Sequence, residues 1–522
     1  MGLLASLPSS YASYTGTCAA VLALYLIGGA IYRLYLSPVS KFPGPKLAAL
    51  TFWYEFYFDV YQRGQYTFKI RELHSRYGPI VRINPCELHV ETPSFYEEVY
   101  AGGGKRRNKW EWFTNQFGIP ESVFTSAPHD LHRMRRAALN PFFSTASVRK
   151  LQPVIDERLS VFMQRFEEFQ QNDEVMTISL AFAAYANDVV MEYAYARCDH
   201  RLEAKDFDPS FHDASLVGAT MGHTTKQLTW ILPIMQVLPD WVTVMLNSDM
   251  ASYVKLQGDI LKQISSIQQE SYDGHLKVSH PTIFHEILNS KLPAEEKSPS
   301  RLWQDGQVTV IAGTLTTAWS LSVTTYHLLT RPNVLRRLRA ELETAIPDAD
   351  QYVPLSALEK LPYLTACVQE GLRLSCGVSS RLQRIAPDED LIYTDPKTSK
   401  AWTIPRGTPI GLTSLLIHYN EEVFPESHIF KPERWIENPR LDNYLVAFSK
   451  GSRACIGINL AYAELYLALA AIFRKYGSRE VRGESGYLEL FETTDRDWEI
   501  VGDGITPLVA ADSKGIRVKV KK

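Results

Sequence analysis

The sequence lacks the features that mark several large protein classes. Its 55 Lys and Arg nearly balance 58 Asp and Glu, which gives a net charge of −3 and a pI near 6.5. This balance offers no electrostatic reason to expect nucleic acid as a partner. Six cysteines are scattered over 522 residues without a Cys-x-x-Cys pair. The sequence therefore indicates neither a zinc site nor a disulfide framework, and a reducing location that faces the cytosol fits best.

Charge is also missing from the first 32 residues. The run from Gly16 to Leu36 is mostly apolar and long enough to cross a bilayer as a helix, which takes roughly 20 residues. A cleaved signal peptide is the alternative, but it normally carries a cation before the apolar stretch. Here the cations Arg33, Lys41 and Lys46 follow the run instead. The positive-inside rule then places the remaining chain in the cytosol, and we expect a single-pass anchor over residues 1–36.

The pattern beyond the anchor predicts one large, mainly α-helical domain with a small β region. Residues 37–47 include a Pro-Gly-Pro run and should form a stiff hinge. Residues 78–92 alternate apolar and polar side chains around Asn-Pro, which indicates a β-hairpin, and 391–413 form a second strand-rich zone. Between these zones the periodicity is mainly helical. With no internal repeat in evidence, residues 48–522 are expected to form a single catalytic domain.

A cysteine near the C-terminal end has the surroundings that a thiolate metal ligand needs. The segment Phe448–Gly457 reads Phe-x-x-Gly-x-Arg-x-Cys-x-Gly. A helix is expected just after it, so Cys455 would lie where free N–H groups and the helix dipole favour negative charge on sulfur. Gly451 and Gly457 lack a Cβ and would let the backbone approach a flat ligand. Arg453 offers a cation to a carboxylate. The alternative is a buried structural cysteine in a glycine-rich turn.

A long apolar helix is expected over Arg301–Thr330, with Ser298 and Pro299 at its start and Pro332 after its end. Its middle reads Ala-Gly-Thr-Leu-Thr-Thr over residues 312–317. A glycine followed by hydroxyl residues weakens the helix ladder, because Thr can bond the carbonyl one turn back. That would open room above a flat cofactor. An ordinary buried helix that tolerates small residues is the alternative.

The cysteine segment resembles the haem-binding signature of the cytochrome P450 family, and the resemblance covers most of the chain after residue 40. It implies the cytochrome P450 fold and a haem b whose iron takes the Cys455 thiolate as a ligand. It also implies that Phe448 packs beside the sulfur. In the family, side chains at four positions matched here reach the haem propionates: His132, Arg136, Arg381 and Arg453. For His132 and Arg136, a solvated basic helix face is the alternative.

The resemblance gives the central helix a catalytic role. In the family this stretch reads Ala/Gly-Gly-x-acid-Thr-Thr/Ser, and the Thr after the acid helps to deliver protons during oxygen activation. Thr316 matches that Thr, with Gly313 and Thr317 beside it. The acid position, however, holds Leu315, which cannot relay a proton. Water held by Thr316, or a hydroxyl of the substrate, could substitute.

Glu370 and Arg373 lie three residues apart and share a helix face. Alone, such a pair is usually a surface ion pair of little energetic value. In the family's order of motifs, however, a Pro-Glu-Arg-Trp segment follows, here over 432–435. The resemblance then implies that Glu370, Arg373 and Arg434 form a buried network that steadies the loop beneath the haem.

Two kinds of surface are expected to serve partners. Scattered cations could form a docking face for an acidic electron donor, or could simply be solvated: Arg133, Arg135, Arg336, Arg337 and Lys450. Two apolar regions match segments that line the substrate pocket in the family: residues 110–124, with two Trp and three Phe, and residues 230–241. Packing in the core would also explain such apolar clusters. The prolines of the second region favour an exposed apolar loop and hence a membrane contact.

The expected function is a haem-thiolate monooxygenase on the cytosolic face of the endoplasmic reticulum membrane. No flavin or nucleotide domain is evident, so electrons would come from NADPH through NADPH–cytochrome P450 reductase. The sequence around His132–Ser144 and Ala447–Gly451 resembles that of fungal members that tailor secondary metabolites. This resemblance implies a hydrophobic small-molecule substrate of terpenoid or polyketide origin. Leu315 motivates an alternative, a haem-thiolate isomerase, cyclase or peroxide-using enzyme. A haem-binding protein without turnover is a third.

Overall fold

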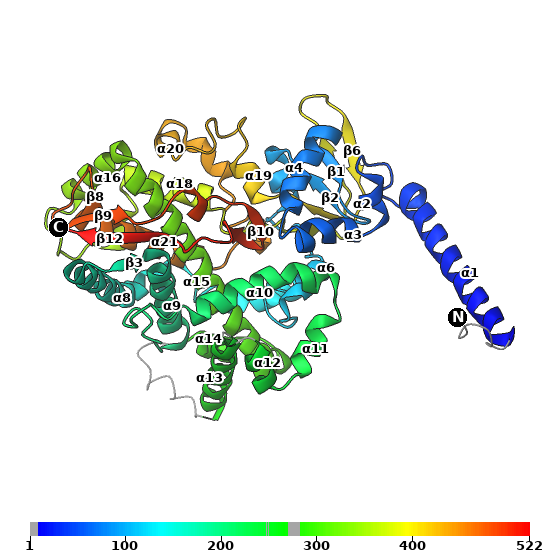
Figure 1. Cartoon of the computed structure of the whole chain (residues 1–522), viewed down its shortest axis with the longest axis horizontal. Helices are drawn as coiled ribbons and strands as arrows, with labels where there is room; N and C mark the ends of the chain where they lie inside the picture. The colour runs from blue at the N-terminus through cyan, green and yellow to red at the C-terminus, as the bar shows by residue number, and fades with distance from the viewer. Residues whose placement is uncertain (1–8, 247, 249, 270–281) are drawn as a thin grey trace, which may run out of the picture.

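The computed structural model describes the whole chain except residues 1–8, 247, 249 and 270–281 (Figure 1). Within the described part the fold is mainly α-helical with a small β region, as predicted. The longer helices of the body are α7 (His129–Leu139), α8 (Thr145–Asn172), α9 (Ile178–Tyr195), α10 (Ser210–Gln227), α13 (Met250–Gln269), α15 (Pro299–Thr330), α16 (Pro332–Ala345), α18 (Pro362–Ser375) and α21 (Ile458–Lys475).

Shorter helices connect and cover these. They are α2 (Lys46–Leu50), α3 (Trp53–Phe56), α4 (Tyr66–Tyr77), α5 (Tyr96–Val99), α6 (Glu111–Thr114), α11 (Ile231–Val237), α12 (Asp240–Leu246), α14 (Ile283–Asn289), α17 (Leu355–Leu358), α19 (Ser414–His418) and α20 (Glu433–Glu437). Single turns that matter below are η2 (Tyr57–Tyr61), η4 (Asn115–Phe117) and η8 (Gly451–Arg453).

The central helix α15 organises the domain. It begins at Pro299 with Ser298 as N-cap and ends at Thr330, close to the predicted range. It packs against α9, α18, α13 and α21, and most of its side chains are buried. The helix crosses the middle of the body (Figure 1).

Four small sheets make up the β region of the described residues. The N-terminal sheet has the order β1 (Ile80–Arg82), β2 (Leu88–Val90), β7 (Pro409–Gly411), β4 (Arg384–Ile385). The C-terminal sheet has the order β3 (Val175–Thr177), β12 (Arg517–Lys521), β9 (Gly486–Leu490), β8 (Tyr476–Ser478). Two hairpins complete the set: β5 (Leu391–Thr394) with β6 (Ala401–Ile404), and β10 (Gly502–Gly504) with β11 (Thr506–Leu508). The hairpin predicted over 78–92 is β1–β2, paired with Val81 opposite His89.

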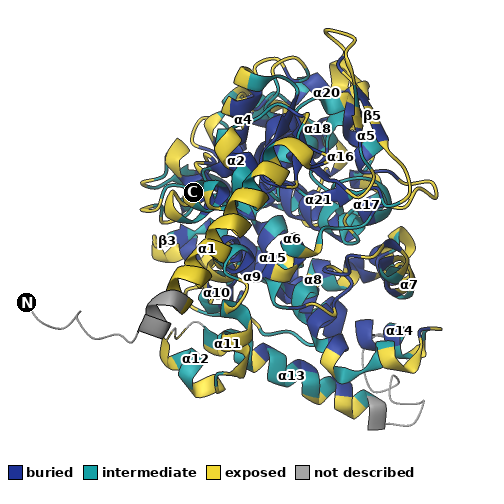
Figure 2. Ribbon diagram, turned by 90° about the vertical axis from the view of Figure 1, so that its right-hand side faces the viewer, coloured by how far each residue is buried: buried dark blue, intermediate teal, exposed yellow. Residues whose placement is uncertain are grey.

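The N-terminal helix α1 (Ser9–Ile31) stands away from this body (Figure 1), and most of its described residues are exposed (Figure 2). Residues Tyr14–Leu36 form an apolar helical span of 23 residues with mean hydropathy 1.7, and none of its most apolar window is buried. By length and composition it can cross a membrane, and a signal sequence would pass the same test. Residues 1–8 of the predicted anchor lie outside the described part. Residues 37–45 of the predicted hinge carry neither helix nor strand, and α2 already begins at Lys46.

Candidate active site

The Cys455 loop is held by its own backbone. The Cys455 N–H donates to the carbonyl oxygen of Phe448 at 2.8 Å, and α21 starts directly afterwards with Gly457 as N-cap. Burial raises the pKa of the Cys455 thiol, while the Gly457 N–H and the nearby Arg136 lower it. Protein therefore surrounds the sulfur closely, yet the residue keeps accessible surface. A thiol in this setting can ligate a metal bound against the loop, because the metal replaces the proton that burial retains.

Gly451 lies at a close contact within the protein. It has φ +72°, and a Cβ there would lie 2.1 Å from the carbonyl oxygen of Tyr100 and 2.3 Å from that of Ala101. Gly451 therefore permits a close approach between two protein segments. At Gly457 a Cβ would meet only the Cys455 sulfur, at 4.0 Å.

A cluster of cations lies beside this loop. Arg453 is buried and donates to the carbonyl oxygens of Ser126 and Ala127 at 2.6 and 2.8 Å. Burial, Arg384 and Arg136 together lower the pKa of Arg453 to about 9. Burial likewise lowers the pKa values of Arg384 and Arg136 and brings that of Lys109 far down.

In the described part of the chain no carboxylate forms an ion pair with any of these four cations, which we call the cation cluster: Lys109, Arg136, Arg384 and Arg453. Burial and the charges of all four lower the pKa of His132 to about 2, so its imidazole is neutral. Among the described residues Arg384 Nε also has no hydrogen-bond partner. Arg384 and Arg453 are buried, and Lys109 and Arg136 are half-buried. Cations removed from water without counter-charges are costly unless an anionic ligand binds there. Two carboxylates of a flat cofactor fit this chemistry.

Arg381, predicted for the same role, is placed elsewhere. Its Nε lies 2.7 Å from Glu87 Oε1 and its Nη2 lies 2.8 Å from Glu55 Oε1. The two carboxylates neutralise the guanidinium inside the protein, which leaves no charge for an external anion. Sequence analysis missed Arg384 and Lys109. The sequence did contain a clue to Arg384, because residues three apart along an extended segment face opposite sides, so Arg384 faces away from Arg381. It contained no clue to Lys109.

The middle of α15 carries the other predicted part of the site. Ala312 is exposed and Gly313 and Thr316 are half-buried, although the surrounding helix is largely buried. Thr316 Oγ1 donates to the carbonyl oxygen of Ala312 at 2.8 Å, the back-bonding predicted from the sequence. Thr317 and Leu315 are buried. One face of the helix is therefore small and accessible where the sequence placed it.

The three predicted members of the ion network lie together. Both Glu370 oxygens accept from Arg373, at 2.8 and 2.9 Å, and Arg434 Nε donates to Glu370 Oε1 at 3.1 Å. Trp435 Nε1 adds a bond of 2.9 Å to the same carboxylate. Arg373 also donates to the carbonyl oxygens of His418 and Ser427. Because every partner is buried and bonded, the network fixes the chain before the Cys455 loop.

Other predicted surfaces differ in detail. Arg135 does not belong to a docking face: it is buried, with its Nε 2.6 Å from Glu296 Oε2, so its charge is neutralised inside. The aromatic region 110–124 packs largely on itself, with ring centroids of Trp110 and Trp112 4.7 Å apart. The region 230–241 is exposed as predicted, but it forms the helices α11 and α12 in place of a loop.

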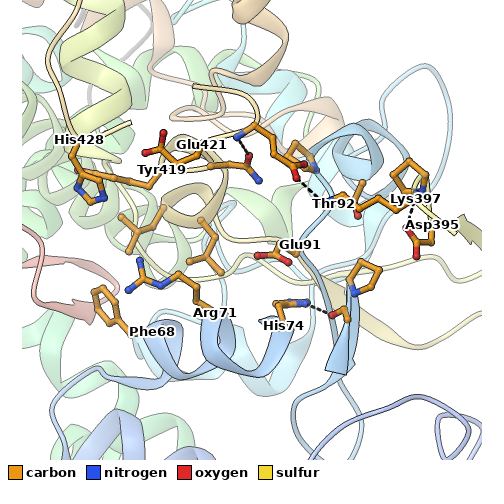
Figure 3. Close-up of a pocket in the computed structure, with 18 of the residues that line it drawn as sticks. Phe68, Arg71, His74, Glu91, Thr92, Asp395, Lys397, Tyr419, Glu421 and His428 are labelled. Carbon is orange, nitrogen blue, oxygen red and sulfur yellow. Dashed lines mark hydrogen bonds and ion pairs between the residues drawn. The ribbon is translucent and has the colours of Figure 1, made fainter. Parts of the chain in front are cut away.

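A pocket of about 590 Å³ opens on the surface between α4, α19 and the segments 395–398 and 498–500 (Figure 3). Its apolar floor includes Phe68, and its rim carries side chains of both charges, among them Arg71 and Glu421. None of the predicted site residues lines it. It is separate from the candidate active site.

A mainly helical body with a cysteine loop, a long helix with an accessible small-residue face, and unpaired cations beside the loop has the chemistry of a haem-thiolate protein. Comparison with known proteins agrees: the cytochrome P450 family model matches residues 43–485. The chain belongs to the cytochrome P450 family.

Its relatives are fungal. The cytochrome P450 monooxygenase tpcC of Cochliobolus heterostrophus is 53% identical over 492 residues, covering 94% of each chain. The cytochrome P450 monooxygenase astB of Talaromyces wortmannii is 48% identical over 507 residues, covering 96% of each. Tryptophan 6-hydroxylase fscE of Fusarium equiseti is 39% identical over 511 residues, covering 97% of each. The chain is a cytochrome P450 monooxygenase, an oxidoreductase of the fungal secondary-metabolism type.

Proposed function

We propose that this monooxygenase is anchored by α1 in the endoplasmic reticulum membrane with its catalytic domain in the cytosol. It takes electrons from NADPH through NADPH–cytochrome P450 reductase and inserts one atom of O2 into a hydrophobic secondary-metabolite scaffold of terpenoid or polyketide origin. The observation that carries the proposal is the cation cluster beside Cys455, which requires an anionic cofactor.

The residues present fit a haem b. Cys455 would ligate the iron, and Lys109, Arg136, Arg384 and Arg453 would hold the two propionates. A haem bound in this way supplies the oxidising chemistry, with electron density from the thiolate favouring O–O cleavage. Neutral His132 adds a hydrogen-bonding group without adding a fifth charge. Phe448 contributes its carbonyl to the Cys455 N–H and its ring to Tyr462, with centroids 5.3 Å apart.

On the α15 side the chain's own residues control water. Thr316 can hold a water molecule with its hydroxyl, because a hydroxyl that donates to the Ala312 carbonyl still accepts one hydrogen bond. Leu315 places a buried isobutyl group where the family has an acid, so no carboxylate of α15 stands next to Thr316. Proton supply then depends on water held by Thr316 or on a hydroxyl of the substrate. This requirement favours substrates that carry a hydroxyl near the oxidised carbon.

The exposed apolar side chains support the membrane and substrate parts of the proposal. Trp230, Val237 and Trp241 are 60%, 79% and 68% exposed. The helices α11 and α1 lie toward the same side of the molecule (Figures 1 and 2). An apolar surface beside an anchor helix is suited to contact with a bilayer, from which a hydrophobic substrate can enter.

Fewer cations remain for a reductase docking face than the sequence predicted. Arg133 and Arg336 are exposed, whereas Arg337 and Lys450 lie 2.5 and 2.7 Å from the carboxylates of Glu433 and Glu97. We assign the docking of an acidic electron donor to exposed cations such as Arg133 and Arg336.

Co-expression with the reductase in a host that supplies candidate precursors tests the proposal. The precursors should include terpenoids, polyketides and indoles, since one relative is named as a tryptophan 6-hydroxylase and another, from Emericella nidulans, as an N-acetyltryptophan 6-hydroxylase. We expect an oxygenated terpenoid or polyketide, with NADPH and O2 consumed in step with product. Product formed without O2 consumption would favour the isomerase or cyclase alternative, and an oxidised indole would contradict the substrate class.

A further inference from the structure

The segment between η4 and α7 is held on one side by the first turns of α15. Asp305 is buried, and its Oδ1 accepts from the Val123 N–H at 2.7 Å. One residue earlier, Gln304 Oε1 accepts from the Glu121 N–H at 2.9 Å. Residues 119–127 form neither helix nor strand, so these side chains of α15 supply partners that regular structure would otherwise give to the backbone.

A row of charges continues from Asp305 to α7. Asp305 Oδ2 lies 2.9 Å from Arg301 Nη2, and Arg301 Nε lies 2.8 Å from Glu296 Oε2. The same Glu296 oxygen lies 2.6 Å from Arg135 Nε. Glu296 belongs to the single turn before α15, η6 (Ala294–Lys297), and Arg135 belongs to α7. We call these four side chains the charge row; its two cations and two carboxylates balance one another.

The far end of the charge row returns to the same segment. Arg135 Nη1 donates to Ser126 Oγ at 2.8 Å, and that hydroxyl donates to the carbonyl oxygen of Ser122 at 2.8 Å. The segment is therefore fixed by the row at Val123 and again at Ser126. Breaking either contact would leave a buried polar group without its partner, which is unfavourable.

The other side of the segment carries the partners of the cation cluster. The carbonyl oxygens of Ser126 and Ala127 are the two that accept from Arg453. Lys109 Nζ donates to the carbonyl oxygen of Phe124, and the Lys109 N–H donates to that of Ala127 at 2.9 Å. Two of the four cations thus take their positions from residues 124–127, and a shift of this stretch would move both.

We propose that Asp305 and Arg135 are positioning residues for the cofactor. Through residues 121–127 they hold Arg453 and Lys109 where the carboxylates of the haem bind. Neither side chain belongs to the cation cluster; both act through the backbone carbonyls that orient the guanidinium and the ammonium. The inference rests on the proposed function for the identity of the cofactor, and on the contacts above for the positioning. α15 then has two tasks, because its first turns secure the propionate side while residues 312–317 form the accessible face.

Hydrogen exchange of the holoenzyme in detergent tests the hold on the segment. Asp305→Leu removes the acceptor of the Val123 N–H, so amides of 121–127 should exchange about 10-fold faster than in the wild type. Asp305→Asn keeps an oxygen at that place and should stay near the wild-type rate. Unchanged exchange over 121–127 in Asp305→Leu would overturn the proposal.

Arg339→Met is the matched control for the loss of a buried, ion-paired side chain. Arg339 is buried on α16, is paired with Glu343 at 2.6 Å and donates to the carbonyl oxygen of Phe473 at 2.7 Å. These partners lie outside residues 119–127. The variant should therefore lower stability without changing exchange over 121–127 or the retention of haem.

The rate of haem transfer to an excess of apomyoglobin tests the action on the cofactor. We expect Asp305→Leu and Arg453→Met each to raise the rate about 10-fold, the effect of losing one charge-assisted contact. Because Asp305 acts partly through Arg453, the double variant D305L/R453M should fall severalfold short of the roughly 100-fold increase that independent effects would give. Asp305→Asn should stay within about 2-fold of the wild type, since it still accepts from the Val123 N–H.

Ser126→Ala is the milder variant and serves if Asp305→Leu does not fold. It removes the contact with Arg135 and should raise the rate of haem loss severalfold. Wild-type rates in both variants, or a double variant that reaches the full product, would overturn the proposal. If the wild type binds no haem, the proposed function fails, while exchange over 121–127 still judges the hold on the segment.

Discussion

Arg381 and Arg384 are three residues apart and place their guanidinium groups in opposite electrostatic settings. Burial opposes the charge of Arg381, but Glu55 and Glu87 raise its pKa well above the ordinary value. Burial lowers the pKa of Arg384, which forms no ion pair within the described residues and lies 4.9 Å over the ring of Tyr100. One arginine therefore holds the fold together, and the other is left for a ligand.

Exchanging each arginine for methionine should separate these two roles. Arg384→Met should lower haem affinity about 10-fold, a typical effect of losing one charge-assisted contact of 1.4 kcal/mol, with little loss of folded apoprotein. Arg381→Met leaves the buried carboxylate of Glu87 without its cation and removes one of the two cations on Glu55, which keeps Lys226, so it should destabilise the fold by about 3–5 kcal/mol. The measurements are haem content per folded protein and the denaturation midpoint. Haem loss in Arg381→Met without destabilisation would reverse the assignment.

Cys455→Ser should remove the thiolate signature from the spectrum of the reduced CO complex and reduce turnover to background. The hydroxyl of serine is a far weaker ligand than a thiolate, while the Cys455 N–H bond to Phe448 is kept, so the far-ultraviolet dichroism should not change. Cys376→Ser is the matched control, because that thiol is buried beside His418 and lies outside the loop. A thiolate spectrum that survives in Cys455→Ser would refute the ligand.

Sequence patterns predicted those parts of the structure that depend on residues close together in the chain. The Cys455 loop, the course of α15 and the β1–β2 hairpin follow from caps, turns and periodicity within about thirty residues. The Glu370 network was expected from the order of motifs. Long-range partners could not be foreseen in this way. Whether Arg381 or Arg384 faces a ligand is decided by Glu55 and Glu87, which lie about three hundred residues earlier.

The same limit applies to the lysines. Lys226 reads as an ordinary polar position in α10, and only the folded chain shows that α3 and η2 bring two carboxylates onto it. Lys109 follows a run of cations and gave no sign that burial would place it near Arg453 and Arg384. Buried charge is a property of packing between distant segments, and composition alone does not reveal it.

Leu315→Glu restores an acid next to Thr316 and should improve coupling. We expect the wild type to release part of its reduced oxygen as peroxide on substrates without a suitable hydroxyl, since proton delivery then depends on water alone. The variant should lower that fraction severalfold, measured as peroxide formed per NADPH consumed. Leu315→Gln, which has a similar shape and no acid, is the control. If the wild type already couples as tightly as Leu315→Glu, the leucine does not limit proton delivery.

Glu464 should make stability fall as pH rises. It is buried in α21, its Oε2 lacks a partner among the described residues, and burial alone raises its pKa well above the ordinary value. The native state then keeps a proton that the unfolded chain releases above about pH 4.3. Unfolding therefore becomes easier as pH increases from that point up to the native pKa.

Glu464→Gln removes this titration while keeping size and polarity. We expect the variant to be more stable than the wild type by roughly 1–2 kcal/mol at pH 8, the usual scale for relieving an unsatisfied buried polar group, and nearly equal to it at pH 4. Urea denaturation of the holoprotein in detergent at several pH values measures the difference. Asp350→Asn is the control, because Lys475 lowers the pKa of that exposed carboxyl and its slope has the opposite sign. Parallel pH profiles of the wild type and Glu464→Gln would show that Glu464 has the same pKa in the native and unfolded states, which would contradict the prediction.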